Sequence, residues 1–524
     1  MANPSVMKHD FSRIPQAEIQ RSVFNRSHAY KTTFDAGNLI PFYVDECVPG
    51  DSFNVDATLF ARMTTPIYPI MDNLVLDVHF FAVPIRLVWD NFVYFMGERI
   101  NPDDETDFFV PQIVSPASGG WTNGSLSDYF GLPTGVASLS TSALWHRSYA
   151  LIWNLWYCDQ NIQDPINVQH GDGPDAPTLY PLLRRGKRHD YFTSALPWPQ
   201  KGPAVELPLG DTARVFVDDA LSGTKYVSID NASGSPRNIS LNTLSNPVYG
   251  TTSLIEPASV PLLADLSTGT AATINALRQA FQLQRLLERD ARGGTRYTEI
   301  VRAHFGVTSP DARLQRPEYL GGTSARVNLT SVAQTSGTAG SGAYTPDPLG
   351  TLAAVGTITA KGGFTKSFTE HSLILGLCSV RADLTYQQGI PRMFSRKTKH
   401  DFYWPALAHL GEQAVLNKEI YCDGTSADDA VFGYQERWAE YRYYPSKITG
   451  QFRSNFATPL DAWHLSQYFA DLPTLSPAFI EDKPPMERIL AVQDAPHFFM
   501  DTFISARTAR PMPTYSVPGM IDHF

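Results

Sequence analysis

The stretch "DNLVLDVHFFAVPIRLVW", residues 72–89, decides the fold class. In an extended chain its apolar and polar residues separate onto opposite faces: Leu74, Leu76, Val78 and Phe80 against Asp77 and His79. Pro84 then ends the run, because proline cannot donate to a strand ladder. Alternation over this length predicts a half-buried antiparallel strand.

The same period of two recurs elsewhere in the chain. It is clear in "LCSVRADLTYQQG" (377–389), and further strand candidates lie at 42–48, 53–63, 214–230, 326–333, 415–422 and 438–444. Long connections separate these segments, which favours a Greek-key or jelly-roll β-sandwich with elaborated loops over a meander.

Two segments have helical rather than strand periodicity. Residues 273–294 place apolar side chains over about half the circumference of a helix and end at Gly293 and Gly294. Residues 142–162 carry large apolar residues at helical spacing. We expect both helices to pack on the sandwich or on a neighbouring molecule rather than to hold a cofactor.

The composition indicates a surface that is covered by other molecules. The chain has 524 residues and a formal charge of −10, from 42 basic and 52 acidic residues. Charged residues make up 18%, below the roughly 25% of typical soluble domains. Aromatic residues reach 12%, and such residues are enriched at protein contacts.

Several function classes lack their sequence signals. No apolar run approaches the ~20 residues needed to cross a bilayer, and the start of the chain has no signal-peptide core. Cys47, Cys158, Cys378 and Cys422 are far apart without a CxxC pair, which favours buried free thiols over a zinc site. Phosphate-loop, serine-hydrolase and zinc-protease motifs are missing. We therefore expect no enzyme activity, cofactor or metal.

Two basic runs are each followed by His, Asp and aromatic residues. The cations are Arg184, Arg185, Lys187 and Arg188 in the first run, and Arg396, Lys397 and Lys399 in the second. Cations beside aromatic rings suit single-stranded nucleic acid, where phosphates meet charge and bases stack. A solvated loop or a salt-bridge patch between subunits is an equally open interpretation.

The stretch "FGYQERWAEYRYYPSKITGQFR", residues 432–453, mixes rings and charges. We interpret it as a subunit interface with alternate residues in a core strand, its contact residues being Trp438, Tyr441, Arg442, Tyr443 and Tyr444. The alternative is a carbohydrate-binding or glycoside-active β-sandwich. Sugar hydrolysis needs carboxylates on both sides of a cleft, whereas one strand would put Glu436 and Glu440 on the same side.

Three segments differ from the rest in composition. Residues 203–268 are rich in turn-forming residues and 333–363 nearly lack charge and large side chains, so both are expected as surface loops. Residues 459–524 contain many prolines, which predicts an extended C-terminal arm without continuous helix or central strand.

Long strings of this chain resemble the major capsid proteins of microviruses, small bacteriophages with single-stranded DNA, and in particular the gokushovirus branch. The matching strings run in order over nearly the whole chain and include "DVHFFAVPIRLVWDNFVYFMGE" (77–98), "YALIWNLWYCDQNIQD" (149–164), "RRGKRHDYFTSALPWPQKGPAV" (184–205), "FYWPALAHLGEQAVLNKEIY" (402–421) and "ARPMPTYSVPGMIDHF" (509–524). The likeness is weakest at 206–268 and 333–363.

The resemblance implies an eight-stranded antiparallel jelly-roll subunit, spanning 1–524, with long loop insertions and a few peripheral helices. It further implies self-association through pentamers into a T=1 icosahedral shell around circular single-stranded DNA. Implied partners are a small basic internal DNA-binding protein, a pilot protein, an internal scaffolding protein and a host surface receptor, with no membrane. Residues 203–268 would form a protrusion at the three-fold axis used in host attachment. Such a protein is made in the bacterial cytoplasm and resides in the virion.

Overall fold

The computed structural model describes residues 20–203, 205, 214–217, 225–229, 237–241, 262–265, 274–335 and 350–515. The chain divides into two compact units. The first comprises Met1–Pro199 with Gly293–Phe524, and the second comprises Gln200–Arg292.

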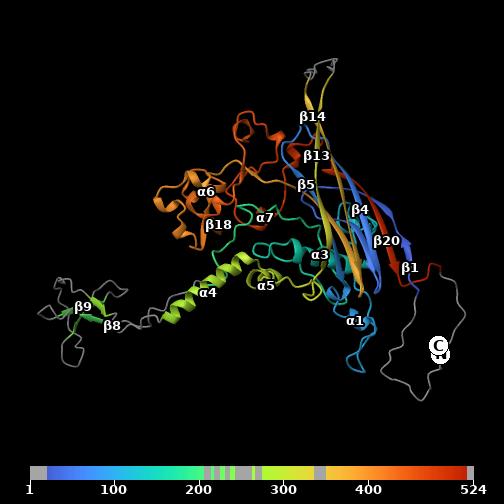
Figure 1. Ribbon diagram of the computed structural model, residues 1–524, viewed down its shortest axis with the longest axis horizontal. Coiled ribbons are helices and arrows are strands. Elements are labelled where there is room, and N and C mark those ends of the chain that lie inside the picture. The colour runs from blue at the N-terminus through green and yellow to red at the C-terminus, as the bar shows by residue number, and fades with distance from the viewer. Residues whose placement is uncertain are drawn as a thin grey trace. The chain divides into compact units, whose positions relative to one another are not determined.

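Two antiparallel sheets form the centre of the first unit. One has the order β1 (Ser22–Asn25), β20 (Phe498–Arg510), β4 (Ser52–Met63), β14 (Leu352–Ser367) and β13 (Asn328–Ala333), with β2 (His28–Phe34) also paired to β20. The other has the order β12 (Glu318–Arg326), β5 (Leu74–Pro84), β15 (Ser372–Ala382) and β3 (Ile40–Cys47). The predicted class of antiparallel β structure is confirmed (Figure 1).

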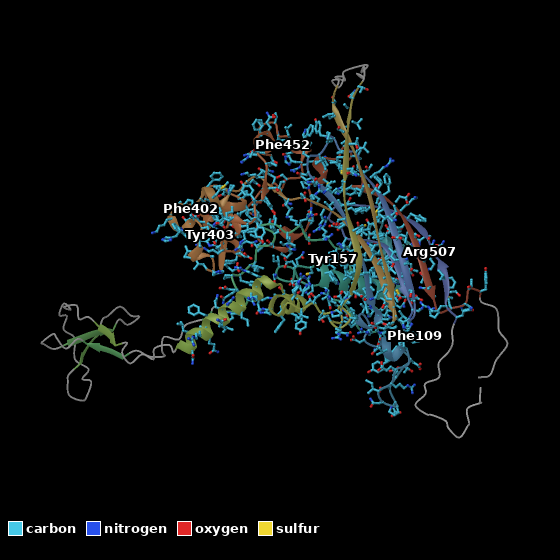
Figure 2. The ribbon with its side chains drawn as sticks, viewed as in Figure 1. Phe109, Tyr157, Phe402, Tyr403, Phe452 and Arg507 are labelled. Carbon is cyan, nitrogen blue, oxygen red and sulfur yellow. The ribbon has the colours of Figure 1, made fainter. Side chains whose placement is uncertain are left out.

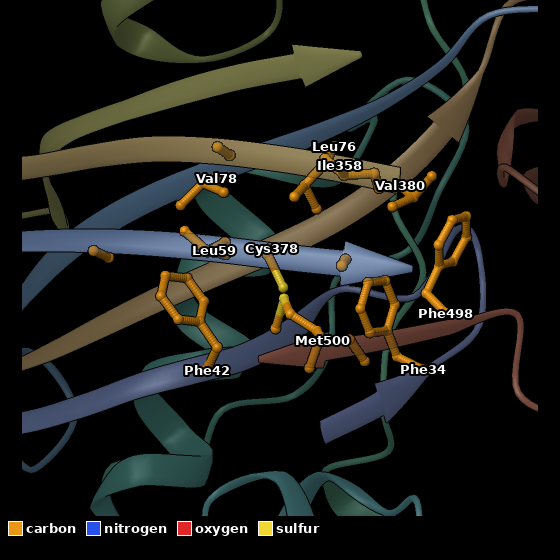
Figure 3. Packing of buried hydrophobic residues seen from close by; sticks show 14 of the residues in the cluster. Phe34, Phe42, Leu59, Leu76, Val78, Ile358, Cys378, Val380, Phe498 and Met500 are labelled. Carbon is orange, nitrogen blue, oxygen red and sulfur yellow. The ribbon is translucent and has the colours of Figure 1, made fainter. Parts of the chain in front are cut away.

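The main core lies between these two sheets. Leu59, Ile358 and Met500 from the first sheet meet Leu76, Val78 and Cys378 from the second (Figure 3). Strand β4 alternates buried and exposed residues along its length, as residues 53–63 predict. The apolar face predicted for 72–89 points into this core, because Leu74, Leu76, Val78 and Phe80 all belong to the buried cluster.

The prediction that β5 is half-buried is wrong, since its other face is covered as well. A second apolar cluster joins Phe81 and Leu377 of the sheet to Tyr149 of helix α3 (Leu144–Ile152). The Tyr149 hydroxyl donates to the Leu39 carbonyl at 2.8 Å, which fixes the helix on the sheet. A strand between two covered layers is apolar on both faces, as β15 is over nearly its whole length.

Helix α3 is shorter than the predicted 142–162. It continues as one π-helical turn, Trp153–Tyr157, and ends at Cys158. Helix α4 (Ile274–Gly293) agrees with the prediction, and Gly294 follows it with φ +99. Phe281 and Leu283 on α4 are exposed. Shorter helices are α1 (Phe92–Phe95), α2 (Leu126–Tyr129), α5 (Tyr297–Phe305), α6 (Asn417–Ile420) and α7 (Pro477–Ile480).

Strand β14 corrects the expectation that 333–363 is a surface loop. Its inward residues include Ala354, Ile358 and Ala360. Their period of two is intact, but most of the side chains are too small to stand out as a strand signal. Residues 336–349 of this segment lie outside the described residues.

Strand β20 corrects the expectation for residues 459–524. It lies between β4 and the two N-terminal strands, although no central strand was expected there. Prolines flank the strand at Pro496 and Pro511, and none occurs between them, so every ladder donor is available.

Smaller sheets complete the two units. In the first unit β6 (Gln112–Val114) pairs with β7 (Ser140–Ser142), β16 (Thr385–Tyr386) with β19 (Ser446–Lys447), and β17 (Glu412–Leu416) with β18 (Val431–Glu436). The strand expected at 415–422 therefore gives way to α6 after Leu416. In the second unit β8 (Arg214–Val217) pairs with β11 (Leu262–Asp265), and β9 (Lys225–Ile229) with β10 (Arg237–Leu241). Most of 203–268 lies outside the described residues.

Within the described residues, no helix has the length and apolar character that crossing a bilayer requires. Cys47, Cys158 and Cys378 are buried free thiols, as expected, whereas Cys422 is partly exposed. The same residues contain no group of His, Cys, Asp and Glu side chains arranged to hold a metal ion.

Candidate functional site

The first basic run, 184–188, is held mainly inside the subunit. Arg185 reaches Asp77 of β5 at 2.7 Å, and Arg381 of β15 reaches the same carboxylate at 2.7 Å. Burial raises the pKa of Asp77, but a hydrogen bond from Ser324 and the two guanidinium groups outweigh it, so the pKa is lowered overall. Arg185 also lies over the ring of Tyr157. This cluster joins the run to two strands of the sandwich.

Lys187 is the most enclosed cation of that run, with 8% of its surface exposed. Its Nζ donates to Gln467 at 3.0 Å and lies 4.3 Å from the centre of the Phe479 ring. Burial lowers its pKa to about 8. Nearby, burial raises the pKa of Asp482 to about 6.

The other two members of the run differ from each other. Arg184 is half-buried and donates to the carbonyls of Ala36 and Asp482. Arg188 pairs with Asp383 at 2.6 Å, and 45% of its side chain is exposed. The structure therefore leaves Arg188 as the member of this run best placed to meet another molecule.

The second basic run, 396–399, has one enclosed cation and two exposed ones. Arg396 pairs with Glu440 at 3.4 Å and lies 4.4 Å from the centre of the Tyr441 ring. Lys397 and Lys399 point to solvent in a short turn that Asp401 caps through backbone N–H groups. The three aromatic residues that follow are about half exposed: Phe402 52%, Tyr403 46% and Trp404 51%. Phe402 and Tyr403 are labelled toward the margin of the first unit in Figure 2.

The stretch 438–444 is not a strand, contrary to expectation. Trp438 has φ +70 and begins a short turn, Ala439–Tyr441. Its ring is 3% exposed, and its Nε1 donates to the Leu407 carbonyl at 2.9 Å. Trp438 is therefore a core residue of the subunit rather than a contact residue. Tyr441, Tyr443 and Tyr444 are 51%, 53% and 62% exposed, and Arg442 pairs with Glu436.

A cavity of about 220 Å³ lies between residues 386–394 and 443–453. Its walls include Phe394, Tyr443 and Tyr444, and Arg392 lies among the polar groups that line it. Arg392 donates to Glu419 at 2.9 Å, and the Tyr191 hydroxyl donates to the same carboxylate. Burial raises the pKa of Glu419. Its carboxylate thus completes a structural network.

The two carboxylates considered for sugar hydrolysis are both engaged by arginine. Glu436 pairs with Arg442, and Glu440 pairs with Arg396. Gln413 also donates to Glu440 at 2.6 Å. Neither carboxylate is placed to face a partner across a sugar cleft, so the geometry does not favour the glycosidase alternative.

The sequence reasoning overlooked one exposed surface, the outward face of the β4–β20 sheet. Phe60 on β4 and Phe499 and Phe503 on β20 point to solvent, with exposed fractions of 40%, 45% and 55%. The sequence does indicate this surface within 53–63: residues there alternate between apolar and polar, and Phe60 stands at a position where the alternation calls for a polar residue. The two phenylalanines of β20 lie in the segment expected as an arm.

Comparison with known proteins gives consistent matches over the whole chain. A family model described as capsid protein (F protein) matches residues 12–520. The chain is 48% identical to capsid protein VP1 of Bdellovibrio phage phiMH2K, with 99% of this chain and 98% of that protein covered. It is 44% identical to capsid protein VP1 of Chlamydia phage 1, with the same coverage. Against capsid protein VP1 of Spiroplasma virus 4 the identity is 38%, over 99% of each chain.

Proposed function

This chain belongs to the F-protein family of phage capsid proteins, and from that membership we propose how it builds a shell. It is a structural capsid protein and a component of the virion, not an enzyme. We propose that copies associate through pentamers into a T=1 icosahedral shell that encloses circular single-stranded DNA.

The strand order is the observation that carries the proposed architecture. Among the described residues, eight strands form the sandwich, namely β2, β3, β4, β5, β12, β14, β15 and β20, and β1 and β13 extend it. Numbered along the chain, they lie in the orders 1-8-3-6 and 2-7-4-5 in the two sheets. These orders support an eight-stranded jelly roll, in which two interlocked Greek keys fold over each other and protect the sheet edges. Viral capsid subunits commonly use this architecture.

We propose that Tyr441, Arg442, Tyr443 and Tyr444 contact a neighbouring subunit. Their exposed rings supply apolar area, and Arg442 gives the contact a charge that can set its register. Replacing Tyr443 and Tyr444 by Ser should leave the fold intact and reduce shell yield in sedimentation. Unchanged yield would contradict this assignment. A Phe402→Ser variant, which removes an exposed ring outside this set, is the matched control.

The charge of the chain constrains its partners. At a formal charge of −10 it cannot neutralise packaged DNA by itself, so most compensation must come from another cationic molecule or from small ions. This supports a small basic internal protein as a partner, beside pilot and scaffolding proteins. Of the cations proposed for DNA or internal-protein contact, Arg188, Lys397 and Lys399 have the exposure that such contact requires.

Negative-stain imaging combined with sedimentation tests the proposed function. The full chain, co-expressed with the other structural proteins of its phage, should yield closed isometric particles or pentamers. A chain that remains monomeric under those conditions would overturn the proposed assembly. Deleting 203–268 should leave the particles intact while abolishing adsorption to the host, if that insertion is the attachment element.

A further inference from the structure

The outward face of the β2–β20–β4–β14 sheet carries rings and positive charge together. The register places its outward residues in rows that cross these strands. One row contains Phe499 beside Arg62, and the row two residues along contains Phe60 beside Asp501. Phe503 lies in the next outward row, so each β20 phenylalanine is a diagonal neighbour of Phe60. Such diagonal neighbours are roughly 7–8 Å apart, within reach of aromatic side chains.

Exposed aromatic residues are unusual at these positions. An antiparallel sheet with one solvated face normally presents polar residues there, and most of this face does so, although Val355 on β14 is also exposed. Its polar residues include Asn54 and Thr58 on β4, Thr359 on β14 and Ser505 on β20. Three phenylalanines at 40–55% exposure therefore indicate a surface that another molecule covers.

The charges on this face favour an anionic partner. Its cations are Lys31, Arg62, Lys361 and Arg507, and its carboxylates are Asp56 and Asp501. The face is thus positive, although the whole chain is negative at −10. Lys31 pairs with Asp501 at 2.6 Å. Within the described part of the chain, no carboxylate lies within ion-pair distance of Arg62, Lys361 or Arg507.

The surface around Phe60 is also hollowed. A shallow depression of about 840 Å³ is lined by Tyr30, Lys31, Phe60, Arg62 and Phe499. Asp128 and Asp501 also line it, and Lys31 pairs with Asp501. The guanidinium of Arg62 lies 5.6 Å from the centre of the Phe60 ring, which keeps a cation beside an accessible aromatic face. Threonine hydroxyls around the depression can donate to phosphate oxygens.

We propose that this sheet face is a binding platform for single-stranded DNA, with bases on Phe60, Phe499 and Phe503 and phosphates on Arg62, Lys361 and Arg507. The inference rests on the proposed role of the chain as a shell around such DNA, and it makes this face the inner wall of the shell. Base stacking on sheet aromatics flanked by cations tolerates any sequence, because every base has a flat face. The inner wall of a shell meets every part of the packaged DNA, so it must bind DNA of any sequence.

Fluorescence anisotropy with a labelled oligo(dT) of about twenty nucleotides tests the platform on the purified full-length chain. In a stacking variant, Phe60, Phe499 and Phe503 are each replaced by Leu, which keeps apolar bulk but removes the aromatic faces. We expect binding to weaken by about tenfold or more, and replacement by Tyr at the same positions to preserve it. A loss below about threefold in the Leu variant, or an equal loss in the Tyr variant, overturns the proposal.

The charges and a matched control complete the experiment. Changing Arg62, Lys361 and Arg507 to Gln should lower the slope of log affinity against log salt by about 2, since each phosphate contact on a single strand contributes about 0.7. The control replaces Phe109, Phe456 and Tyr468 by Leu, which removes three exposed rings that lie outside both basic runs. A binding loss confined to the control overturns the platform.

Particle imaging separates failure of this inference from failure of the proposed function. If the Leu variant forms shells with normal DNA content and binds oligo(dT) normally, the platform is excluded while the shell role stands. If it binds oligo(dT) normally but forms no shells, the face is a contact between copies of the chain, and the inference is again overturned. If the unmodified chain forms no shells with its phage partners, the proposed function itself fails.

Discussion

The two basic runs of this chain place similar residues in different surroundings. In the run 184–188, Arg185 and Lys187 are enclosed by Asp77, Gln467 and aromatic rings. In the run 396–399, only Arg396 is enclosed, while Lys397 and Lys399 remain in solvent. A run of cations therefore has two uses in one molecule: it compensates buried carboxylates, or it offers charge to a partner. The two uses predict different responses to substitution.

The largest effect is expected for Arg185→Met. The side chain is 14% exposed, and its removal leaves Asp77 with Arg381 as its remaining cation. Breaking a buried ion pair costs about 3–5 kcal/mol when the remaining charge is left alone; because Asp77 keeps Arg381 and the hydrogen bond from Ser324, we expect about 2–3 kcal/mol. Urea unfolding of the full chain should show a loss of that order, with Lys397→Met as the exposed control. A loss below about 1 kcal/mol would mean that the first run is no more structural than the second.

The second effect in size concerns Asp482, which lies beside the first run. Its pKa is raised by burial to about 6, with Arg381 and Lys187 opposing the shift. The folded chain therefore holds this proton more tightly than the unfolded chain, so its stabilising contribution is present below ~pH 4 and is lost as the pH rises toward 6. Asp482→Asn should remove this slope and raise the free energy of unfolding above pH 6 by about 1–3 kcal/mol.

Lys187 titrates above the pH range in which Asp482 is measured. Burial lowers its pKa to about 8, so its contribution changes between pH 8 and its ordinary range near 10.4, where stability rises with pH. Burial also lowers the pKa of His79, His146, His464 and His497, so these groups titrate in the same range. The difference in urea midpoints between the Asn variant and the parent chain, recorded between ~pH 4 and 7, therefore isolates the carboxyl group. Identical pH profiles for the Asn variant and the parent chain would show that Asp482 is not protonated in the fold.

A smaller loss is expected for Arg396→Met, the enclosed member of the second run. Glu440 would keep a hydrogen bond from Gln413 at 2.6 Å, and Arg392 lies 4.0 Å away. Because the carboxylate is not left alone, we expect destabilisation of about 1–2 kcal/mol, including the lost contact with the Tyr441 ring. A loss as large as that of Arg185→Met would erase the contrast between the runs.

The smallest effect on stability is expected for Lys397→Gln with Lys399→Gln. Both side chains are exposed, so the free energy of unfolding should change by no more than about 0.5 kcal/mol. If these lysines meet DNA or a basic-protein partner, the DNA content of particles should change while the thermal midpoint does not. A clear fall in the thermal midpoint would contradict their assignment as solvent-exposed groups.

A strand is predictable from the sequence where large apolar side chains alternate with polar ones. Residues 53–63 and 72–84 alternate with large side chains and become β4 and β5. Strand β14 alternates mainly with alanine and glycine, and β20 stands among prolines, so both were assigned to irregular segments although each lies inside the sheet. β14 and β20 form strands because they pair with neighbouring strands, and the residues within each segment do not specify those partners.

The candidate contact residues were predictable by type but not by exposure. Trp438 and Tyr441 stand three residues apart in one aromatic stretch, yet one is 3% and the other 51% exposed. The turn at Trp438, with φ +70, directs its ring toward the Leu407 carbonyl. Nothing in the period of the stretch distinguishes the two rings.

By itself, the sequence determined the antiparallel β class, the absence of known catalytic motifs and the negative charge of the chain, because each follows from local patterns or from composition. The tertiary structure alone decided which cations and rings remain available to partners. Asp77 and Arg185 are 108 residues apart, and Phe60 joins Phe499 and Phe503 only through the pairing of β4 with β20. Ion pairs and surface patches are made by neighbours in space, and chain order does not specify those neighbours.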